Sequence, residues 1–413
     1  MTLERSVEIG TWVIEAGLAG ISEPDLLRGF CERLGAAGIP LMRAIVGIDT
    51  LHPIHEGRIF RWHRDRTDLS AVSEYGRTGA NSNTEEVWRR SPFYRLIETG
   101  GSLLRRNLAR GDPADFLMLE ELRAEGMTDY MAMMHRFAAD GVIGEMDCVY
   151  SSWASDAPEG LTDDQASALC RLMPSLALAM KSASLARIAE TLVETYLGRD
   201  AGRRVLSGRI ARGVADWIGA VLWYSDLRGY TRITDTAPPE QVIPLLNDYA
   251  EAVISAVHEA GGDVLKLIGD GTLALFKAED PGAACGCALE AEALARQRIA
   301  ALNERRAAAG LPVTQVYLGL HIGDVFYGNI GSSDRLDFTA VGPAVNEVSR
   351  IAALCRSAER EVLVSSAFAA AAKPPDRARL VSVGRFALRG VGRPQELFTL
   401  EGTMESIPET PAH

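Results

Sequence analysis

The stretch VLWYSDLRGYT, residues 221–231, shows most clearly how this chain folds. Its apolar run Val221–Tyr224 predicts a short buried strand, and Asp226 follows directly before a glycine-containing turn. A similar arrangement lies in KLIGDGT (266–272), where Asp270 stands at the tip of a predicted hairpin. Both carboxylates are therefore expected at the ends of buried strands, where an ionised group needs a cation or a hydrogen-bond donor.

The residues that follow predict helices alternating with strands, an α/β (α+β) arrangement. Helical patterns occur at 239–261, at 287–308 and after Pro343, and a further strand is expected at VYLGLHIG, residues 316–323. One domain is therefore expected over residues 214–403, which is an ordinary size for a globular domain.

Residues 1–180 predict a second domain with a different order of elements. A helix with Ser22 as its N-cap is followed by two strands, a helical middle, two more strands and a closing helix capped by Thr162. The two strand pairs are expected at 42–51 and 57–65, and at 130–138 and 144–154, with the turn AADG (138–141) in the second pair. This order resembles a GAF-type sensor domain, which implies a sensory or regulatory role.

Residues 181–213 predict a linker or transducer helix between the two domains. An apolar stripe recurs at spacings of three and four residues, and it consists of Leu185, Ile188, Leu192 and Tyr196. Two interpretations stay open: the stripe packs on its own domain, or it pairs with a second copy across a dimer axis. After Gly198 we expect a short basic connection, and at the other end of the chain residues 404–413 predict a disordered tail.

The composition is that of a folded protein and excludes several functional classes. Of the 413 residues, 47% are hydrophobic and 24% are charged, which suffices for more than one packed core. The net charge of −12 argues against a protein that binds duplex nucleic acid, because such proteins present a basic face. We expect a cytoplasmic protein with no membrane partner. The first residues do not match a signal peptide, and Pro174 and Lys181 interrupt the longest apolar stretch.

Residue types that often form metal or nucleophile sites lack the required spacing. The six cysteines include no CxxC pair and are expected to be free, buried thiols. His52 and His55 have no third ligand nearby and are interpreted as loop histidines, and His321 is interpreted as a core histidine. The sequence contains no Walker, GxSxG or HExxH motif.

Five ordered motifs in residues 214–403 resemble those of class III adenylate and guanylate cyclases. SDLRGYT and KLIGDG are similar to the two metal-binding motifs of that family, and the others are GLHIGDVFYGNIG, FTAVGPAVNEVSR and RFALRGVGRPQELFTL. The resemblance implies a ferredoxin-like βαββαβ fold and a homodimer whose active site lies at the interface. It also implies two Mg²⁺ or Mn²⁺ ions, held by Asp226 and Asp270, and ATP as the substrate.

The same resemblance implies roles for residues outside the acid pair. Lys266 matches the lysine with which adenylate cyclases bind the adenine, and Thr339 matches a second base-contacting position, as in the threonine-bearing subclass IIIb. Asn346 and Arg350 lie one helical turn apart and match the residues that orient the ribose and stabilise the transition state.

Further residues are candidates for binding the phosphates. Arg389 matches a position at which relatives bind the terminal phosphates, and Arg335 is a second candidate. Independently of the resemblance, one turn is suited to cradle phosphate oxygens with its backbone N–H groups. It comprises Leu227, Arg228, Gly229, Tyr230 and Thr231.

One position departs from the family, and three alternatives to an adenylate cyclase stay open. Pro343 replaces the usual aspartate; proline is accepted in the first turn of a helix, but the hydrogen bond of the aspartate is lost. The alternatives are a guanylate cyclase, an inactive cyclase-like regulator, and a sensor whose function resides in residues 1–180. Lys266 favours ATP, because guanylate cyclases usually have an acidic residue there. An unidentified small molecule or protein is expected as the effector of residues 1–180.

Overall fold

The computed structural model describes residues 2–66, 70–76, 83–137, 144, 146–388 and 394–401. The chain divides into two compact units, Met1–Leu192 and Val193–His413.

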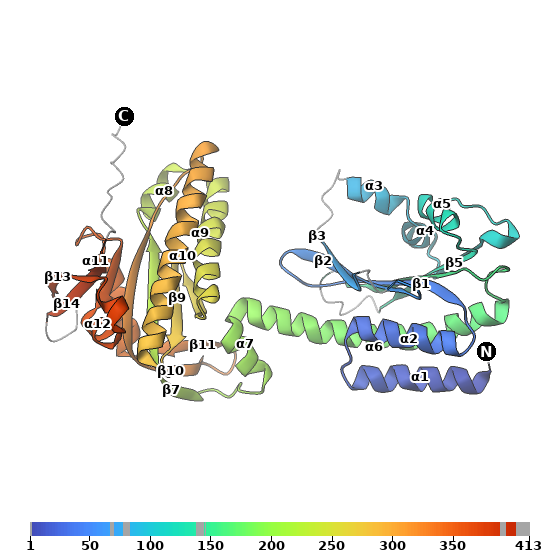
Figure 1. The fold of residues 1–413 in the computed structure, drawn as a ribbon, viewed down its shortest axis with the longest axis horizontal. Coiled ribbons are helices and arrows are strands. Elements are labelled where there is room, and N and C mark those ends of the chain that lie inside the picture. Colours follow the sequence, from blue (N-terminus) through green and yellow to red (C-terminus); the bar gives the residue numbers. More distant parts are fainter. Residues whose placement is uncertain are drawn as a thin grey trace. The chain divides into compact units, whose positions relative to one another are not determined.

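The N-terminal unit is built on a six-stranded antiparallel sheet with the order β3-β2-β1-β6-β5-β4. Helices α1, α2 and α6 cover one face of this sheet, and α3, α4 and α5 lie on the other (Figure 1). Its helices are α1 (Leu3–Leu18), α2 (Glu23–Ala36), α3 (Asn83–Arg89), α4 (Pro92–Thr99), α5 (Leu117–Ala124) and α6 (Asp163–Leu197). Its strands are β1 (Leu41–Asp49), β2 (His55–His63), β3 (Val72–Gly76), β4 (Leu103–Asn107), β5 (Asp129–Arg136) and β6 (Cys148–Ser155).

The predicted strand pairs are present, since β1 pairs with β2 and β5 pairs with β6, each antiparallel. The AADG turn lies outside the described residues. The sequence patterns missed α1, β3 and β4. The order of elements is consistent with a GAF-like fold, and membership of the GAF family stays a prediction.

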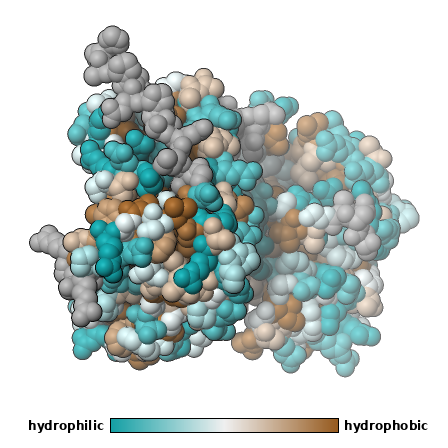
Figure 2. Space-filling model, turned by 60° about the vertical axis from the view of Figure 1, so that its left-hand side comes forward, coloured by the Kyte–Doolittle hydropathy of each residue, from teal (hydrophilic) through white to brown (hydrophobic). Residues whose placement is uncertain are grey.

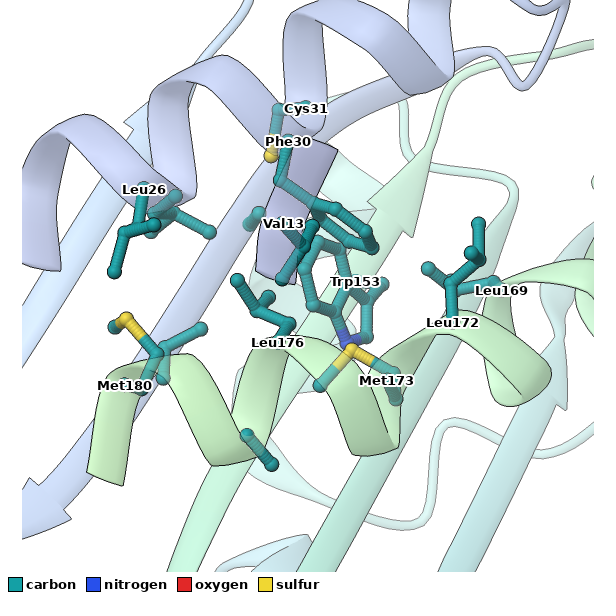
Figure 3. Close-up of a cluster of buried hydrophobic side chains, with 14 of the residues drawn as sticks. Val13, Leu26, Phe30, Cys31, Trp153, Leu169, Leu172, Met173, Leu176 and Met180 are labelled. Atoms are coloured by element: carbon teal, nitrogen blue, oxygen red, sulfur yellow. The ribbon is translucent and has the colours of Figure 1, made fainter. Parts of the chain in front are cut away.

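The main core of this unit lies between the sheet and the helices α1, α2 and α6. Figure 3 shows the side chains of Val13, Phe30, Trp153 and Leu176 directed towards one another from these elements. The rings of Phe30 and Trp153 meet edge to face with their centroids 5.7 Å apart. Because α1 supplies part of this core, the first helix is an integral part of the unit.

The predicted closing helix and linker helix are one continuous helix, α6, which begins after the predicted cap. The Gln165 N–H donates to Thr162 Oγ1 (3.2 Å), and the Thr162 N–H donates to Gln165 Oε1 (2.8 Å). Ile188 is buried in the core of the N-terminal unit, and Leu185 and Leu192 pack against that core. Tyr196 is 81% exposed. Most of the predicted apolar stripe therefore packs on its own unit.

The C-terminal unit contains the predicted ferredoxin-like arrangement. Its sheet has the order β13-β14-β12-β10-β7-β9-β8, and β11 pairs with β10. Strands β10, β7, β9 and β8 and helices α9 and α10 form the βαββαβ part, with both helices along one side of the sheet (Figure 1). Its strands are β7 (Ala215–Leu227), β8 (Asp263–Ile268), β9 (Gly271–Lys277), β10 (Val316–Gly331), β11 (Leu336–Val341), β12 (Val362–Ser365), β13 (Leu380–Phe386) and β14 (Gln395–Leu400). Its helices are α7 (Arg199–Leu206), α8 (Tyr230–Thr236), α9 (Pro239–Glu259), α10 (Pro281–Ala308), α11 (Pro343–Leu354), α12 (Ser366–Ala371) and α13 (Pro374–Arg377).

Strand β7 is apolar on both faces because both faces are covered. Val221 and Trp223 belong to the core beneath α9 and α10, whereas Ala220 and Leu222 belong to the opposite core with α11. This explains why VLWY shows no alternation between apolar and polar residues.

The expected basic connection after Gly198 is largely a helix, α7, held in a network of ion pairs. Arg204 donates to Asp200 (2.7 Å) and to Asp216 (2.6 Å), while Lys277 donates to Asp200 (2.6 Å) and Arg209 to Asp216 (2.5 Å). Arg199–Leu206 of the expected basic connection are thus helical.

The described surface has an ordinary mixture of residues. On the face that Figure 2 presents, hydrophobic side chains form small patches between hydrophilic ones. Over the residues that the structure describes, no helix has both the length and the apolar character that a membrane crossing requires.

Candidate active site

The structure brings Asp226 and Asp270 together at one end of two neighbouring strands. Asp226 lies near the end of β7, and Asp270 lies in the turn between β8 and β9. Because β7 pairs with β9 up to Ser225 and Thr272, the two acids emerge side by side. The Leu227 N–H donates to both carboxylates, at 3.1 Å to Asp226 Oδ1 and 3.2 Å to Asp270 Oδ2.

The acid pair lies in a cavity of about 180 Å³. Most of its wall is apolar and comes from α9, β8 and β10. The lining comprises Ser225, Asp226, Leu227, Ile243, Leu246, Asn247, Tyr249, Ala250, Val253, Leu267, Gly269, Asp270, Gly271, Thr272 and Val316. Burial and the neighbouring Asp270 carboxyl raise the pKa of Asp226 to about 7. The pair therefore resists holding two negative charges in the absence of a cation.

The acid pair fits a divalent cation that keeps part of its solvent shell. No arginine or lysine of the described chain forms an ion pair with Asp226 or Asp270, whereas Asp200, Asp216 and Glu292 of the same unit each have such a partner. No cluster of three or more His, Cys, Asp or Glu suited to a metal occurs among the described residues. Two carboxylates without further protein ligands match Mg²⁺, which is commonly bound by one or two carboxylates together with water and substrate phosphates.

The predicted phosphate cradle is smaller than expected. The Leu227 N–H is already bound to the two carboxylates, and the Arg228 N–H donates to the Gln315 carbonyl (2.7 Å). Only Gly229, Tyr230 and Thr231 remain for such a role, at the start of α8. Arg228 is excluded from the cradle because the carbonyl of Gln315, the residue directly before β10, accepts its N–H.

Lys266 is paired with a residue that the sequence patterns missed. Its Nζ donates to Asp337 Oδ2 on β11, two residues before Thr339. Alternate residues of a strand share a face, so this spacing could have identified Asp337 from the sequence. The structure thus places Lys266 near the strand that contains Thr339. Thr339 itself is only 9% exposed. None of these three residues lines the cavity of the acid pair.

Asn346 and Arg350 lie on α11, which begins at Pro343 as expected. Asn346 is exposed and Arg350 is half-buried. Within the described ranges, neither side chain forms an ion pair or a side-chain hydrogen bond, so both are available to a bound molecule. They too are absent from the lining of the acid cavity.

The remaining candidates are peripheral. Arg335 is exposed in the turn between β10 and β11, and Arg389 lies outside the described residues. His52 Nδ1 accepts the backbone N–H groups of Ile54 (3.1 Å) and His55 (3.3 Å), as a residue that shapes a loop does. The described cysteines are all free thiols.

Comparisons with known proteins give matches to the C-terminal unit. A family model described as the adenylate and guanylate cyclase catalytic domain matches residues 219–402. An adenylate cyclase of Anabaena cylindrica is 36% identical over 157 residues, which are 37% of this chain and 30% of that protein. Adenylate cyclase 1 of Rhizobium meliloti is 27% identical over 223 residues, which are 52% of this chain and 33% of that protein. The matches thus span about a third of the length of these two relatives.

A solved structure, that of the adenylyl cyclase CyaB from P. aeruginosa, is 22% identical with a TM-score of 0.42, and it covers 48% of this chain and 100% of that one. The similarity to this family rests on the sequence match over residues 219–402. Within that stretch the sheet brings the two strand-end acids together. Residues 219–402 of the C-terminal unit thus match the family model of the adenylate and guanylate cyclase catalytic domain.

Proposed function

We propose that this chain is an adenylate cyclase that converts ATP to 3′,5′-cyclic AMP and pyrophosphate. The main support is the acid pair: Asp226 and Asp270 share the Leu227 N–H and have no cationic partner among the described residues. Two matched relatives are named adenylate cyclases. Lys266 supports ATP over GTP, since guanylate cyclases usually have an acidic residue at its position.

In this proposal Asp226 and Asp270 hold two divalent cations, Mg²⁺ or Mn²⁺. When bound, such ions neutralise the triphosphate and lower the pKa of the ribose 3′-hydroxyl. In this proposal the triphosphate would bind beside the two carboxylates, and the apolar wall of the cavity would exclude competing water. The 3′-oxygen attacks the α-phosphorus in line, and pyrophosphate leaves from the opposite side.

Other side chains would bind the base and stabilise the transition state. Lys266, held by Asp337, would donate to an acceptor on the adenine, and Thr339 would contribute a hydroxyl. Asn346 would orient the ribose, and the guanidinium of Arg350 would stabilise charge on the phosphorus in the transition state. Arg335 and Arg389 are proposed contacts to the terminal phosphates.

We further propose that the active site forms between two copies of the chain. Lys266, Thr339, Asn346 and Arg350 do not line the cavity of the acid pair, so one copy supplies the acids and the other the base and ribose contacts. The C-terminal unit also exposes apolar surface near β11. Trp217 and Phe326, which are 57% and 49% exposed, pack edge to face on adjacent strands with their ring centroids 4.4 Å apart.

The N-terminal residues are proposed to regulate this activity. Residues 1–180 would act as a GAF-like sensor for a small-molecule or protein effector, residues 181–213 as the transducer, 214–403 as the catalytic domain and 404–413 as a tail. The continuous helix α6 supports this view, because it starts in one unit and ends in the other.

The first test is an assay of cyclic nucleotide formation by the full chain with Mn²⁺ and either ATP or GTP. We expect cAMP formation, and we expect Asp226→Ala and Asp270→Ala to reduce it by about 100-fold or more, since each removes a ligand of the cations. Asp235→Ala is the matched control, because Asp235 is an exposed aspartate nine positions after Asp226. An inactive folded protein would instead indicate the regulator, and a preference for GTP would contradict the role of Lys266.

The shared site is tested by mixing two inactive variants, Asp270→Ala and Arg350→Ala. A mixed dimer has one intact site, so we expect mixing to restore up to about a quarter of the wild-type rate. If activity stays absent although the mixture forms dimers, each copy has its own complete site and the proposal fails.

A further inference from the structure

His321 of β10 is buried, at 6% exposure, and both of its ring nitrogens are bonded. Nδ1 lies 2.9 Å from Ser365 Oγ, and Nε2 lies 3.0 Å from Glu347 Oε2. Glu347 belongs to α11 and directly follows Asn346. The histidine is therefore a core residue, as expected, but it is also bonded to the helix on which the proposed ribose and transition-state contacts lie.

The hydrogen bonds assign one tautomer to His321. Ser365 Oγ accepts the Phe368 N–H (3.1 Å) as the N-cap of α12, which leaves its hydroxyl hydrogen for His321 Nδ1. The ring proton then resides on Nε2 and is donated to the Glu347 carboxylate. Burial lowers the pKa of His321 while Glu347 opposes that shift, and the balance agrees with a neutral ring.

Helix α11 lies unusually close to β10 on both sides of this histidine. A Cβ atom at Gly319 would lie 2.7 Å from the Val348 carbonyl oxygen, and one at Gly323 would lie 2.8 Å from the Ala344 Cβ. Gly319, His321 and Gly323 share one face of the strand. The two glycines thus allow the helix to approach, and His321 is the side chain between them that reaches it.

Over the described residues, the N-terminus of α11 has no side-chain cap. Its N-cap residue is Gly342, which has no side chain to bond the first turn, and the buried residues of the helix include small alanines. Glu347, in contrast, is held from two strands: by His321 of β10 and by Gln395 of β14, whose Nε2 donates to Oε1 (3.0 Å).

We propose that His321 and Glu347 are positioning residues that fix the rotation of α11 and thereby the directions of Asn346 and Arg350. Successive helix residues are rotated by about 100° from one another, so the direction of Glu347 determines those of its neighbours. This inference rests on the proposed cyclase activity. It predicts that loss of the bond lowers kcat more than it raises KM, because the affected groups act in the transition state.

The test compares an apolar variant and a conservative variant of the full chain. His321→Leu removes the donor to Glu347, and we expect kcat to fall about 10- to 100-fold, with KM for ATP within about threefold of wild type. His321→Gln retains one donor and one acceptor and should recover most of that loss. Glu347→Ala and Glu347→Gln should behave as a second pair of the same kind.

The control is His258→Leu in the same unit. The ring Nε2 of His258 is buried without a partner among the described residues, so its removal should leave kcat unchanged. The proposal is overturned if His321→Leu retains wild-type kcat, or if the Leu and Gln variants lose equal activity. A wild-type chain without cyclase activity would refute the proposed function instead. In that case the ¹⁵N ring shifts of His321 still test the pairing, since they distinguish the Nε2–H tautomer from a charged ring.

Discussion

Two pairs of aspartates in the C-terminal unit have opposite electrostatic surroundings. Asp200 and Asp216 receive hydrogen bonds from Lys277, Arg204 and Arg209. Asp226 and Asp270 share a single backbone N–H and have no cation among the described residues.

The pKa values follow this difference. Burial raises the pKa of Asp226 to about 7, and Asp270 adds to the shift. Burial would also raise the pKa of Asp200, but the bonds from Lys277 and Arg204 lower it overall. Hydrogen bonding to Arg209 lowers the pKa of Asp216. The comparison shows that the protein neutralises the acids that hold the fold together, and leaves uncompensated the acids that we propose bind cations.

The largest effect on activity is expected when the Asp226–Asp270 pair is given a cationic partner like those of Asp200 and Asp216. Asp270→Lys removes one carboxylate and places a cation beside Asp226, as in the Asp200 network. The lysine then balances the negative charge of Asp226 in place of a metal ion. We expect cyclase activity to fall about 1,000-fold or more. The midpoint of thermal unfolding, measured without metal, should stay equal or rise. A variant that retains Mn²⁺-dependent activity would show that the acid pair is not the metal site.

The next effect concerns stability rather than activity. Asp200→Asn leaves Lys277 without its carboxylate and Arg204 with Asp216 alone, so we expect the free energy of unfolding to fall by about 1–3 kcal/mol. Urea denaturation measures this change, with Asp235→Asn as the exposed control. Asp226→Asn should leave the free energy of unfolding unchanged or raise it. If this variant lost as much stability as Asp200→Asn, the two pairs of aspartates would not differ in the way described.

The smallest effect is a pH dependence. The folded-state pKa of Asp226 lies above its ordinary value of 3.8, so its ionised form is disfavoured by folding. Without metal, the free energy of unfolding should therefore decrease as the pH rises from about 4 to about 7. We expect a change on the order of 1 kcal/mol, because the group is half-exposed and partly screened.

Urea denaturation in EDTA, at pH 5.5 and at pH 8, measures this dependence. The Asp226→Asn variant should lack this part of it. For Asp200 and Asp216 the sign is opposite: their stabilisation is present above pH 3.8 and is lost only as the pH falls below it. Asp200 and Asp216 therefore titrate below the range from pH 5.5 to pH 8 that the experiment covers. A pH dependence of stability that persists in the Asp226→Asn variant would have to come from another group.

Local sequence patterns predicted much of the C-terminal unit, because the residues that form each of these patterns are close together in the chain. The apolar run 221–224, the turn residues around Asp270 and the four-residue spacing of Asn346 and Arg350 each lie within a few positions. The patterns failed where a long-range contact decides the outcome. The connection after Gly198 contains a helix whose Asp200 and Arg204 bond to distant strands. The Arg228 N–H is lost to the predicted cradle because the Gln315 carbonyl accepts it.

By itself, the sequence determined the βαββαβ order of the C-terminal unit and the two strand-end acids, since periodicity and turn chemistry act between neighbours in the chain. Only the tertiary structure decided that the acids meet around one N–H, that Lys266 pairs with Asp337, and that Glu347 is held between His321 and Gln395. These are contacts between residues separated by dozens of positions. Their geometry depends on strand order and register, which spacing along the chain does not contain.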